Sequence, residues 1–437
     1  MERIPFVGLH AHSGVGSPFD GFGYPKDHMN YAHSNGAKAL ALTDHGNMNG
    51  LVYQVMHAKK MQAEGKDFKP IFGVEAYFIP SVAEWKEQIE VFRKDKKLAK
   101  QIDKEQSGTT IENEGASKGI TKHDINKRRH LVLLAQNQTG LNNIFKMVSK
   151  SYTGDNFYRY PRIDLALLEE YGEGVIAASA CLGGVYAGCY WENRDEGPEA
   201  ILNCMLKVTE EMQAVMGDRW YGELQWNNIP EQHELNQYII QVHERTGLKL
   251  ISTCDSHYPS PEAWQSRELY KRLGWLGRKP EWASMELPLT VDEVGYELYP
   301  KNGNQMWDSY KFYSEACGVT YNDDIVYQSI IETATIAFDR IESFLPDTTV
   351  RLPDFVVPAG TDATSYLGQL AFEGLLSVLG SKGIKQNSPQ FKDYNKRLNS
   401  ELDVINAQGF AKYFLTMKAI VDKTSEVQLA GPGRGSA

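Results

Sequence analysis

The sequence predicts an α/β protein whose sheet is built from seven strands joined by helical crossovers. Seven short runs are expected to form strands, and most of them are rich in Val, Ile and Leu, which is typical of strands that are buried on both faces. These runs are residues 6–10, 39–43, 71–75, 130–135, 175–180, 221–225 and 249–254. Amphipathic helical segments separate several of them, so we expect a parallel sheet that closes into a barrel.

Proline and glycine mark the ends of the intervening helices. Pro25 begins a helix that ends at Gly36, and Pro198 begins a longer one that ends at Gly217. Residues 230–247 repeat the pattern. Proline suits the first helical turn, where its missing N–H would be unbonded anyway, and glycine suits the residue after the last turn.

Residues 80–129 interrupt this alternation, because they are rich in Lys, Glu, Asp and Gln and poor in aliphatic side chains. We expect an insertion there, formed by a charged helix and then a mobile loop at about residues 108–119. Residues 284–324 carry Gly, Pro, Asn and Asp at short spacing and are expected to be irregular. Helical segments follow at 325–343, 363–380 (with Asp362 as the N-cap), 390–408 and 413–425. We therefore expect two domains, 1–285 and 286–437.

Composition narrows the class of protein. The 437 residues contain 42% hydrophobic and 23% charged residues, no apolar run long enough to span a bilayer, and no apolar core of a signal peptide at the start. The five cysteines contain no Cys-x-x-Cys pair, which favours a reducing, cytoplasmic setting over a disulfide framework. The formal charge of −10 argues against a chain that binds nucleic acid over its whole surface, although a local basic groove is compatible with it.

Residues that can bind metal recur where the expected strands end. His10 and His12 are two positions apart, so in an extended segment both rings point to the same face, and Asp255 and His257 repeat this arrangement. Since a barrel of parallel strands collects its functional groups at the carboxyl ends, we expect nine side chains to converge. They are His10, His12, Asp20, His45, Glu75, His130, Cys181, Asp255 and His257.

Each of these residues also has an ordinary structural interpretation, such as a helix cap, a turn or a small core thiol. Together they exceed what one ion needs and suit two or three. Glu223, at the sixth strand, has no other candidate ligand beside it. The remaining histidines are assigned to the surface. They are His28, His33, His57, His123, His233 and His243.

The mixture of imidazole, carboxylate and one thiolate favours Zn²⁺, Mn²⁺ or Fe²⁺ over Mg²⁺. A carboxylate-bridged cluster of such ions is suited to the hydrolysis of phosphate esters, because one ion lowers the pKa of a water while another holds the phosphoryl and leaving oxygens. Glu75 is the expected bridge. Glu75, Asp255 and His257 are the expected catalytic residues.

These residues resemble the ligand set of the polymerase-and-histidinol-phosphatase (PHP) family. The resemblance includes the His-x-His start, Asp20, the Thr-Asp-His-Gly of residues 43–46, Glu75, and the Asp-x-His of residues 255–257. It implies a distorted (β/α)7 barrel with a trinuclear metal site in which Glu75 bridges two ions. It also implies three ligand groups: His10, His12 and Asp255; His130 and Cys181; and Asp20, His45 and His257.

Further stretches resemble the family of bacterial DNA polymerase III alpha subunits. They are residues 69–75, 131–140, 161–164, 352–355, 401–405 and 409–415, together with the terminal Gly-Pro-Gly-Arg-Gly-Ser. The terminal stretch is similar to the palm loop that holds the triphosphate of the incoming nucleotide, where backbone N–H groups converge on phosphate. The resemblance implies that residues 286–437 begin a helix-rich α+β palm. It also implies a nucleotide-binding role for Gly433, Arg434, Gly435 and Ser436.

The family's loop continues beyond Ala437, and its catalytic palm aspartates lie further downstream. We therefore do not expect this chain alone to polymerise DNA. The missing C-terminal segment would be supplied separately, for example through a split gene and protein splicing, or would have been removed by truncation. The implied partners are primer–template DNA with its 3′ end, deoxynucleoside triphosphates, that segment and replisome subunits such as a sliding clamp. Mg²⁺ is expected at the completed polymerase site, and no membrane partner is expected.

Three functions remain open at this point. The first is a segment of a replicative DNA polymerase whose PHP barrel acts as a metal-dependent 3′→5′ exonuclease. The second is a stand-alone phosphoesterase for small molecules, such as a histidinol phosphatase, which leaves residues 286–437 without a role. The third is a non-catalytic module that bound metals stabilise by coupling ligation to folding.

Overall fold

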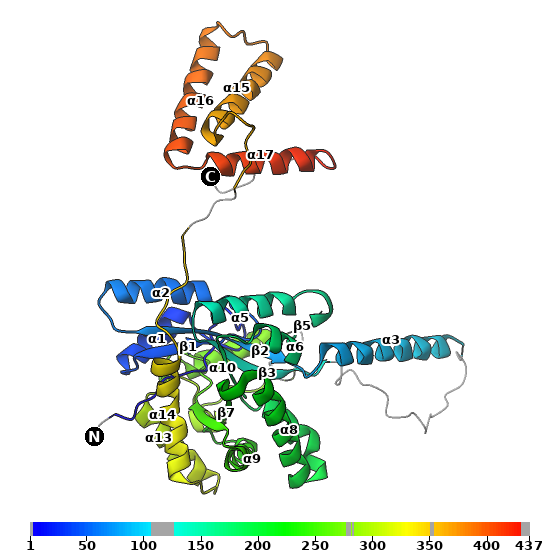
Figure 1. Cartoon of the computed structure of the whole chain (residues 1–437), viewed down its shortest axis with the longest axis vertical. Coiled ribbons are helices and arrows are strands. Elements are labelled where there is room, and N and C mark those ends of the chain that lie inside the picture. Colours follow the sequence, from blue (N-terminus) through cyan, green and yellow to red (C-terminus); the bar gives the residue numbers. More distant parts are fainter. Residues whose placement is uncertain (1–2, 106–125, 277–280, 282–283, 350–353, 430–437) are drawn as a thin grey trace. The chain divides into compact units, whose positions relative to one another are not determined.

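The computed structural model describes residues 3–105, 126–276, 281, 284–349 and 354–429 (Figure 1). The chain divides into two compact units, Met1–Pro346 and Asp347–Ala437. The expected domain boundary near residue 285 lies inside the first unit. No helix among the described residues is both long enough and apolar enough to cross a bilayer.

A six-stranded sheet with the order β1-β2-β3-β6-β7-β8 forms the centre of the first unit. Its strands are β1 (Ala39–Leu42), β2 (Lys69–Phe78), β3 (Arg129–Ala135), β6 (Val175–Ala178), β7 (Trp220–Gln225) and β8 (Lys249–Thr253). Residues 6–10, the seventh expected strand, are extended without forming a regular strand. Gly8 nevertheless bridges Leu40 on β1, and Ala11 bridges Ser256 just after β8, both in parallel. This segment therefore joins the two edges of the sheet and closes a distorted barrel, as expected.

The expectation of an all-parallel sheet is wrong at β3, which runs antiparallel to both β2 and β6. The cause is the insertion. Its helix α3 (Val82–Glu105) leads away from the sheet instead of crossing its face, so the chain returns to the end it left (Figure 1). Tyr77 near the end of β2 consequently pairs with His130 near the start of β3. The loop expected at residues 108–119 lies outside the described residues.

Helices cover the barrel from outside, and their ends follow the proline and glycine signals. They are α1 (Pro25–Ser34), α2 (Leu51–Ala63), α5 (Gln138–Ser151), α6 (Leu165–Tyr171), α7 (Val185–Asn193), α8 (Pro198–Met216), α9 (Pro230–Thr246) and α10 (Trp264–Trp275). In α8 the side chains of Ile201, Met205 and Met212 are buried in the core. Gly247 ends α9 in the left-handed conformation, with φ of 71°, which only glycine adopts without strain.

The region 284–324, expected to be irregular, contains a regular helix. After the short α12 (Val291–Val294), α13 (Gly303–Ala316) begins with a capping box formed by Asn302 and Gln305. The next helix, α14 (Asp323–Thr335), ends earlier than the expected residue 343. A short π-helix, Ile336–Arg340, follows it directly. Ser329 on α14 shares a 2.7 Å hydrogen bond with Ser252 on β8, so this region packs on the barrel.

The second unit contains three helices, close to the expected ranges. They are α15 (Ala363–Ser381), α16 (Pro389–Ala407) and α17 (Ala411–Ser425). Asp362 caps α15 by accepting hydrogen bonds from two backbone N–H groups, as expected. Leu367, Ala411 and Leu415 form a small core. Residues 433–436, the expected nucleotide-binding loop, lie outside the described residues.

The cysteines differ from expectation in one respect. Cys189 on α7 and Cys204 on α8 form a disulfide. Their 15-residue separation matches no motif, and only the packing of the two helices brings them together. Cys181, Cys254 and Cys317 are free.

Two histidines assigned to the surface are fully buried, so that assignment is wrong for them. His28 on α1 has its Nε2 2.9 Å from the carbonyl oxygen of Phe22. His233 on α9 lies between the Asn227 carbonyl oxygen and the Tyr321 hydroxyl. Both imidazoles satisfy backbone groups of loops that the sequence does not place near them. His33, His57 and His243 are partly exposed, and His123 lies outside the described residues.

Burial of His28 predicts acid sensitivity. Burial lowers the pKa of His28 from 6.5 to about 4, and this outweighs the hydrogen bond to Phe22. Because the pKa is lower in the folded state, the stabilisation is present above pH 6.5 and is lost as the pH falls towards about 4. Between about pH 7 and pH 5 we expect a loss of about 2 kcal/mol in unfolding free energy that His28→Gln does not show. Urea titrations at both pH values measure it, with His33→Gln on the same helix as the control. Equal losses in the wild type and His28→Gln would contradict the prediction.

Candidate metal centre

The metal centre begins with the closing segment of the barrel. The backbone N–H of His12 donates to the carbonyl oxygen of Ser256 at 2.7 Å, and the N–H of Ser256 donates to that of His10 at 3.1 Å. These bonds hold residues 10 and 12 extended, so both imidazoles point to the same side, with ring centroids 5.0 Å apart. Both side chains are buried.

Glu75 on β2 lies at the middle of the cluster and is completely buried. Its Oε1 is 3.3 Å from His10 Nε2 and 3.0 Å from His130 Nδ1. Its Oε2 is 3.7 Å from His12 Nε2 and contacts His45 Nδ1. One carboxylate therefore faces four imidazoles, two on each oxygen, which is the arrangement expected of a bridging ligand.

Asp255 follows β8 and approaches the same imidazoles from the other side. Its Oδ1 lies 3.2 Å from His10 Nε2, 3.1 Å from His12 Nε2 and 3.5 Å from His257 Nδ1. The backbone of Asp255 is left-handed, with φ of 49°, a conformation that costs a non-glycine residue energy and that is concentrated at functional sites. The carboxylate that follows this backbone contacts three imidazoles of the cluster.

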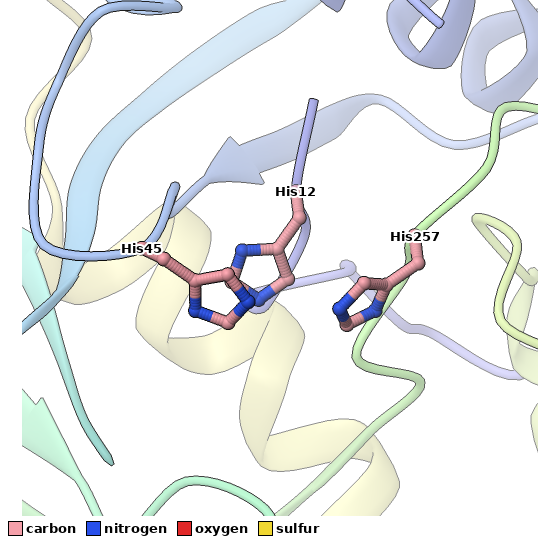
Figure 2. Close-up of side chains that lie close together, drawn as sticks. All are labelled: His12, His45 and His257. Atoms are coloured by element: carbon pink, nitrogen blue, oxygen red, sulfur yellow. The ribbon is translucent and has the colours of Figure 1, made fainter. Parts of the chain in front are cut away.

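A second group of imidazoles lies on the open side of the cluster. His12, His45 and His257 come from separate segments, and their rings lie close together (Figure 2). The ring centroid of His12 lies 4.1 Å from that of His45 and 4.5 Å from that of His257. Asp20 Oδ2 is 3.2 Å from His45 Nε2 and 3.6 Å from His257 Nε2. Arg267 fixes Asp20 by donating to its Oδ1 at 2.6 Å.

Cys181 completes the set. Its Sγ is 3.6 Å from His130 Nδ1 and 4.0 Å from Glu75 Oε1, and it accepts a hydrogen bond from the backbone N–H of Gly183. His130 reaches the cluster because β3 is antiparallel, so its first residues lie where the other strands end. All nine expected side chains thus lie in one cluster. Their assignment as metal ligands, and that of Glu75, Asp255 and His257 as catalytic, stay predictions.

The donor set fits divalent cations because its buried atoms lack other partners. Five of these atoms are buried without a hydrogen bond: His10 Nε2, His12 Nε2, His45 Nδ1, Glu75 Oε2 and Asp255 Oδ1. Leaving them unsatisfied is costly, and a cation that accepts their lone pairs removes the cost. Three overlapping triplets have ligand atoms within 4.8 Å of one another: His10, His12 and Glu75; His45, Glu75 and His130; and His12, His45 and His257. Imidazole and thiol donors suit zinc or iron, and the carboxylates suit manganese.

When no cation is bound, protonated imidazoles compensate the negative charge of the carboxylates in the cluster. Burial opposes the charge on His10, but Asp255 and Glu223 outweigh it and raise the pKa of His10 well above 6.5. Burial together with His45 and His257 lowers the pKa of His12 to about 3, so His12 is neutral and ready to bind a cation. Metal ligation therefore displaces protons from some histidines and none from His12.

Three supporting residues escaped the sequence analysis as functional groups. Glu223 on β7 is buried and lies 2.8 Å from His10 Nδ1, which turns Nε2 of that ring towards the cluster. Asp44 accepts hydrogen bonds from Ser13 and Ser17 and so orders the loop that carries His45. Arg267 is the third. A carboxylate in a buried strand and the Thr-Asp-His motif were usable signals for the first two residues, whereas nothing local distinguishes Arg267.

The fold and the cluster define the class, and the chain belongs to the PHP family, because residues 8–226 match its PHP domain. Residues 365–437 match the bacterial DNA polymerase III alpha NTPase domain.

The curated relatives include DNA polymerase III subunit alpha of Aquifex aeolicus, which is 31% identical over 99% of this chain and 32% of that protein. The subunit of Borreliella burgdorferi is 28% identical over 99% of this chain and 32% of its own length. The subunit of Treponema pallidum is 28% identical over 100% of this chain and 31% of its own length. The chain thus spans about a third of the length of these relatives.

Proposed function

We propose that the barrel is a metal-dependent phosphodiesterase that removes nucleotides from DNA 3′ ends. The observation that carries the proposal is the convergence of buried, unpartnered ligand atoms on Glu75 from separate segments of the chain. When bound, two or three ions of Zn²⁺, Mn²⁺ or Fe²⁺ would lower the pKa of the attacking water and stabilise charge on the phosphoryl and leaving oxygens. The reaction adds water across the terminal P–O bond, so the shortened strand keeps its 3′ hydroxyl and a nucleoside 5′-monophosphate is released.

The chain's own residues set the ligand atoms. His257 Nδ1 is 2.7 Å from the Asp255 carbonyl oxygen, so this nitrogen carries the proton and Nε2 is left to bind a cation near Asp20. Glu223 contacts Nδ1 of His10 in the same way, which leaves Nε2 of that ring to bind a cation. Two of the candidate ligands reach the surface, since 44% of the Asp20 side chain and 23% of that of His130 are exposed. We place the scissile phosphate next to these exposed groups.

We extend the proposal to a polypeptide of the full length of the curated relatives. With the remainder of its relatives' length supplied, it would carry out DNA-directed DNA synthesis in the cytoplasm with Mg²⁺, primer–template DNA and deoxynucleoside triphosphates. Residues 433–436 would contact the triphosphate. A sliding clamp is among the partners that we expect.

The exonuclease is tested with the full 437-residue chain, because the compact unit extends past residue 285 to Pro346. With Mn²⁺ or Zn²⁺ it should shorten a 5′-labelled duplex with a mismatched 3′ end. Asp255→Asn should reduce the rate by about two to three orders of magnitude, the range for losing one charge-stabilising group. Asparagine tolerates the left-handed backbone at this position, so the substitution tests the carboxylate and not the strain.

Asp67→Asn, which changes an exposed carboxylate, is the matched control and should retain the wild-type rate. Wild type and Asp255→Asn that are equally inert with every divalent metal would overturn the exonuclease proposal. Turnover of histidinol phosphate without any effect on DNA would favour the small-molecule phosphoesterase.

A further inference from the structure

A short hairpin lies beside the metal centre, and its backbone is held rigidly. Its strands are β4 (Phe157–Tyr158) and β5 (Tyr160–Pro161), joined at Arg159, whose φ is 61°. The buried Arg162 donates to the carbonyl oxygens of Tyr158 at 2.9 Å, Tyr160 at 3.0 Å and Lys127 at 3.3 Å. These bonds fix the hairpin to the start of β3, the strand that carries His130.

The hairpin continues a row of contacting rings and guanidinium groups, which we call the stack, that begins at the metal centre. Tyr77 lies opposite His130 in the β2–β3 ladder, with ring centroids 5.5 Å apart. The ring of Tyr77 is also nearly parallel to that of His45, at 11°, with centroids 6.4 Å apart. The Arg128 guanidinium lies 5.1 Å from the centroid of Tyr77 and 3.7 Å from that of Tyr160. Tyr160 also meets Tyr77 edge to face, with centroids 5.9 Å apart, so it ends a row of contacts that starts at two candidate metal ligands.

Close packing fixes the distance between this stack and the ligands. Gly46, directly after His45, has φ of 64°, and a Cβ there would lie 3.0 Å from Tyr77 Cε2 and 3.2 Å from Pro161 Cγ. Only glycine gives the ligand loop this backbone and this approach to the hairpin. The glycine of the Thr-Asp-His-Gly motif thus acts as a contact between the metal centre and the stack.

The outer end of the stack offers aromatic surface and positive charge. Tyr160 is 37% exposed. Phe157 on β4 and Tyr152 stack on each other and are 44% and 46% exposed. Among the described residues, neither Arg128 nor Arg159 forms an ion pair with a carboxylate, whereas Lys127 and Arg129 both pair with Glu192. Exposed aromatic rings interleaved with available guanidinium groups are the means by which proteins bind single-stranded nucleic acid.

We propose that Tyr160, supported by Arg128, stacks the unpaired terminal base of a DNA 3′ end and so places the adjoining phosphate at the metal centre. This inference rests on the proposed function and deepens it, because it names unpaired DNA ends as the substrate class. Tyr160 selects single strands because a base in a duplex is already stacked on its neighbours. Arg128 and Arg159 attract the phosphates on either side of the base.

The test compares two substrates of the full chain loaded with Mn²⁺, a 15-nucleotide thymidine strand and bis(p-nitrophenyl) phosphate. Tyr160→Ala should raise KM for the strand by about tenfold, within the range for one lost stacking contact. It should leave the hydrolysis of the small ester unchanged, because that reaction needs only the metal centre. Tyr160→Phe keeps the ring and should stay close to wild type. Phe312→Ala, which removes an exposed ring on α13, is the control.

Two outcomes would overturn the inference. Tyr160→Ala that matches Phe312→Ala on the strand shows that the ring does not bind DNA. Equal losses on both substrates assign Tyr160 to support of the metal centre. If the wild type hydrolyses neither substrate, the proposed function fails by itself. Fluorescence anisotropy then tests separately whether Tyr160 binds DNA. Wild type that binds the labelled strand about tenfold more tightly than Tyr160→Ala then supports it, and equal binding overturns it.

Discussion

Glu75→Gln is expected to lose most of the bound metal and to stop hydrolysis. The amide has the shape of the carboxylate but removes the negative charge that faces four imidazoles. His130 and His45 overcome burial and hold the pKa of Glu75 well below its usual range, so the group that is lost is ionised. A bridging ligand serves two ions at once, and its loss should reduce the expected two or three ions per chain to one or none. Elemental analysis after dialysis counts the ions.

Glu223→Gln is the matched control, because Glu223 contacts His10 without facing the centre of the cluster. Loss of such a supporting carboxylate weakens metal affinity by about 10- to 100-fold. At saturating metal, Glu223→Gln should therefore keep the wild-type number of ions while Glu75→Gln does not. Equal metal content in wild type and Glu75→Gln would show that Glu75 is not a bridge.

The sequence predicted the strands well because each is a short apolar run bounded by polar residues, and burial on both faces requires that pattern. The direction of each strand was less predictable than its position in the sequence. The antiparallel course of β3 depends on how the inserted α3 leaves the sheet, and residues 80–129 carry no local signal of it. His130 nevertheless lies with the other candidate ligands, as expected, since reversal of β3 brings its first residues to their end of the barrel.

The convergence of the candidate ligands was predictable because these residues are chemically unusual for the ends of buried strands. Supporting groups were not equally predictable. Arg267 reaches Asp20 across 247 residues of sequence, and an arginine in an amphipathic helix normally faces solvent. The burial of His28 and His233 depends likewise on carbonyl groups of loops whose positions only the tertiary structure determines.

Removal of metal with a chelator is expected to destabilise the first unit strongly. An ion present at a thousandfold its dissociation constant contributes about 4 kcal/mol of unfolding free energy, and two or three ions contribute more. Without them, buried ligand atoms such as Glu75 Oε2 and Asp255 Oδ1 stay unsatisfied. Thermal unfolding followed by circular dichroism, with and without chelator, measures the difference. The melting temperature of Asp255→Asn should respond less than that of wild type, because its site binds metal more weakly.

The size of this effect should depend on pH in a defined direction. Burial opposes the charge on both rings, but Asp255 and Glu223 raise the pKa of His10, and Glu75 and Asp20 raise the pKa of His45, well above 6.5 in the metal-free chain. The stabilisation from these two protonated groups is present below pH 6.5 and is lost as the pH rises through their folded-state pKa values. The stabilisation from bound metal instead increases as the pH rises, because the same histidines must release their protons before they bind a cation.

The difference in melting temperature between metal-loaded and chelated protein should therefore increase from about pH 6 to about pH 8. A constant difference across this range would show that His10 and His45 do not release protons to metal. A large effect of the chelator on stability, in a chain that never hydrolyses DNA or small phosphate esters, would favour the non-catalytic module over the nuclease. Stability and turnover measured on the same metal-loaded sample thus separate a cluster that holds the barrel together from one that also performs chemistry.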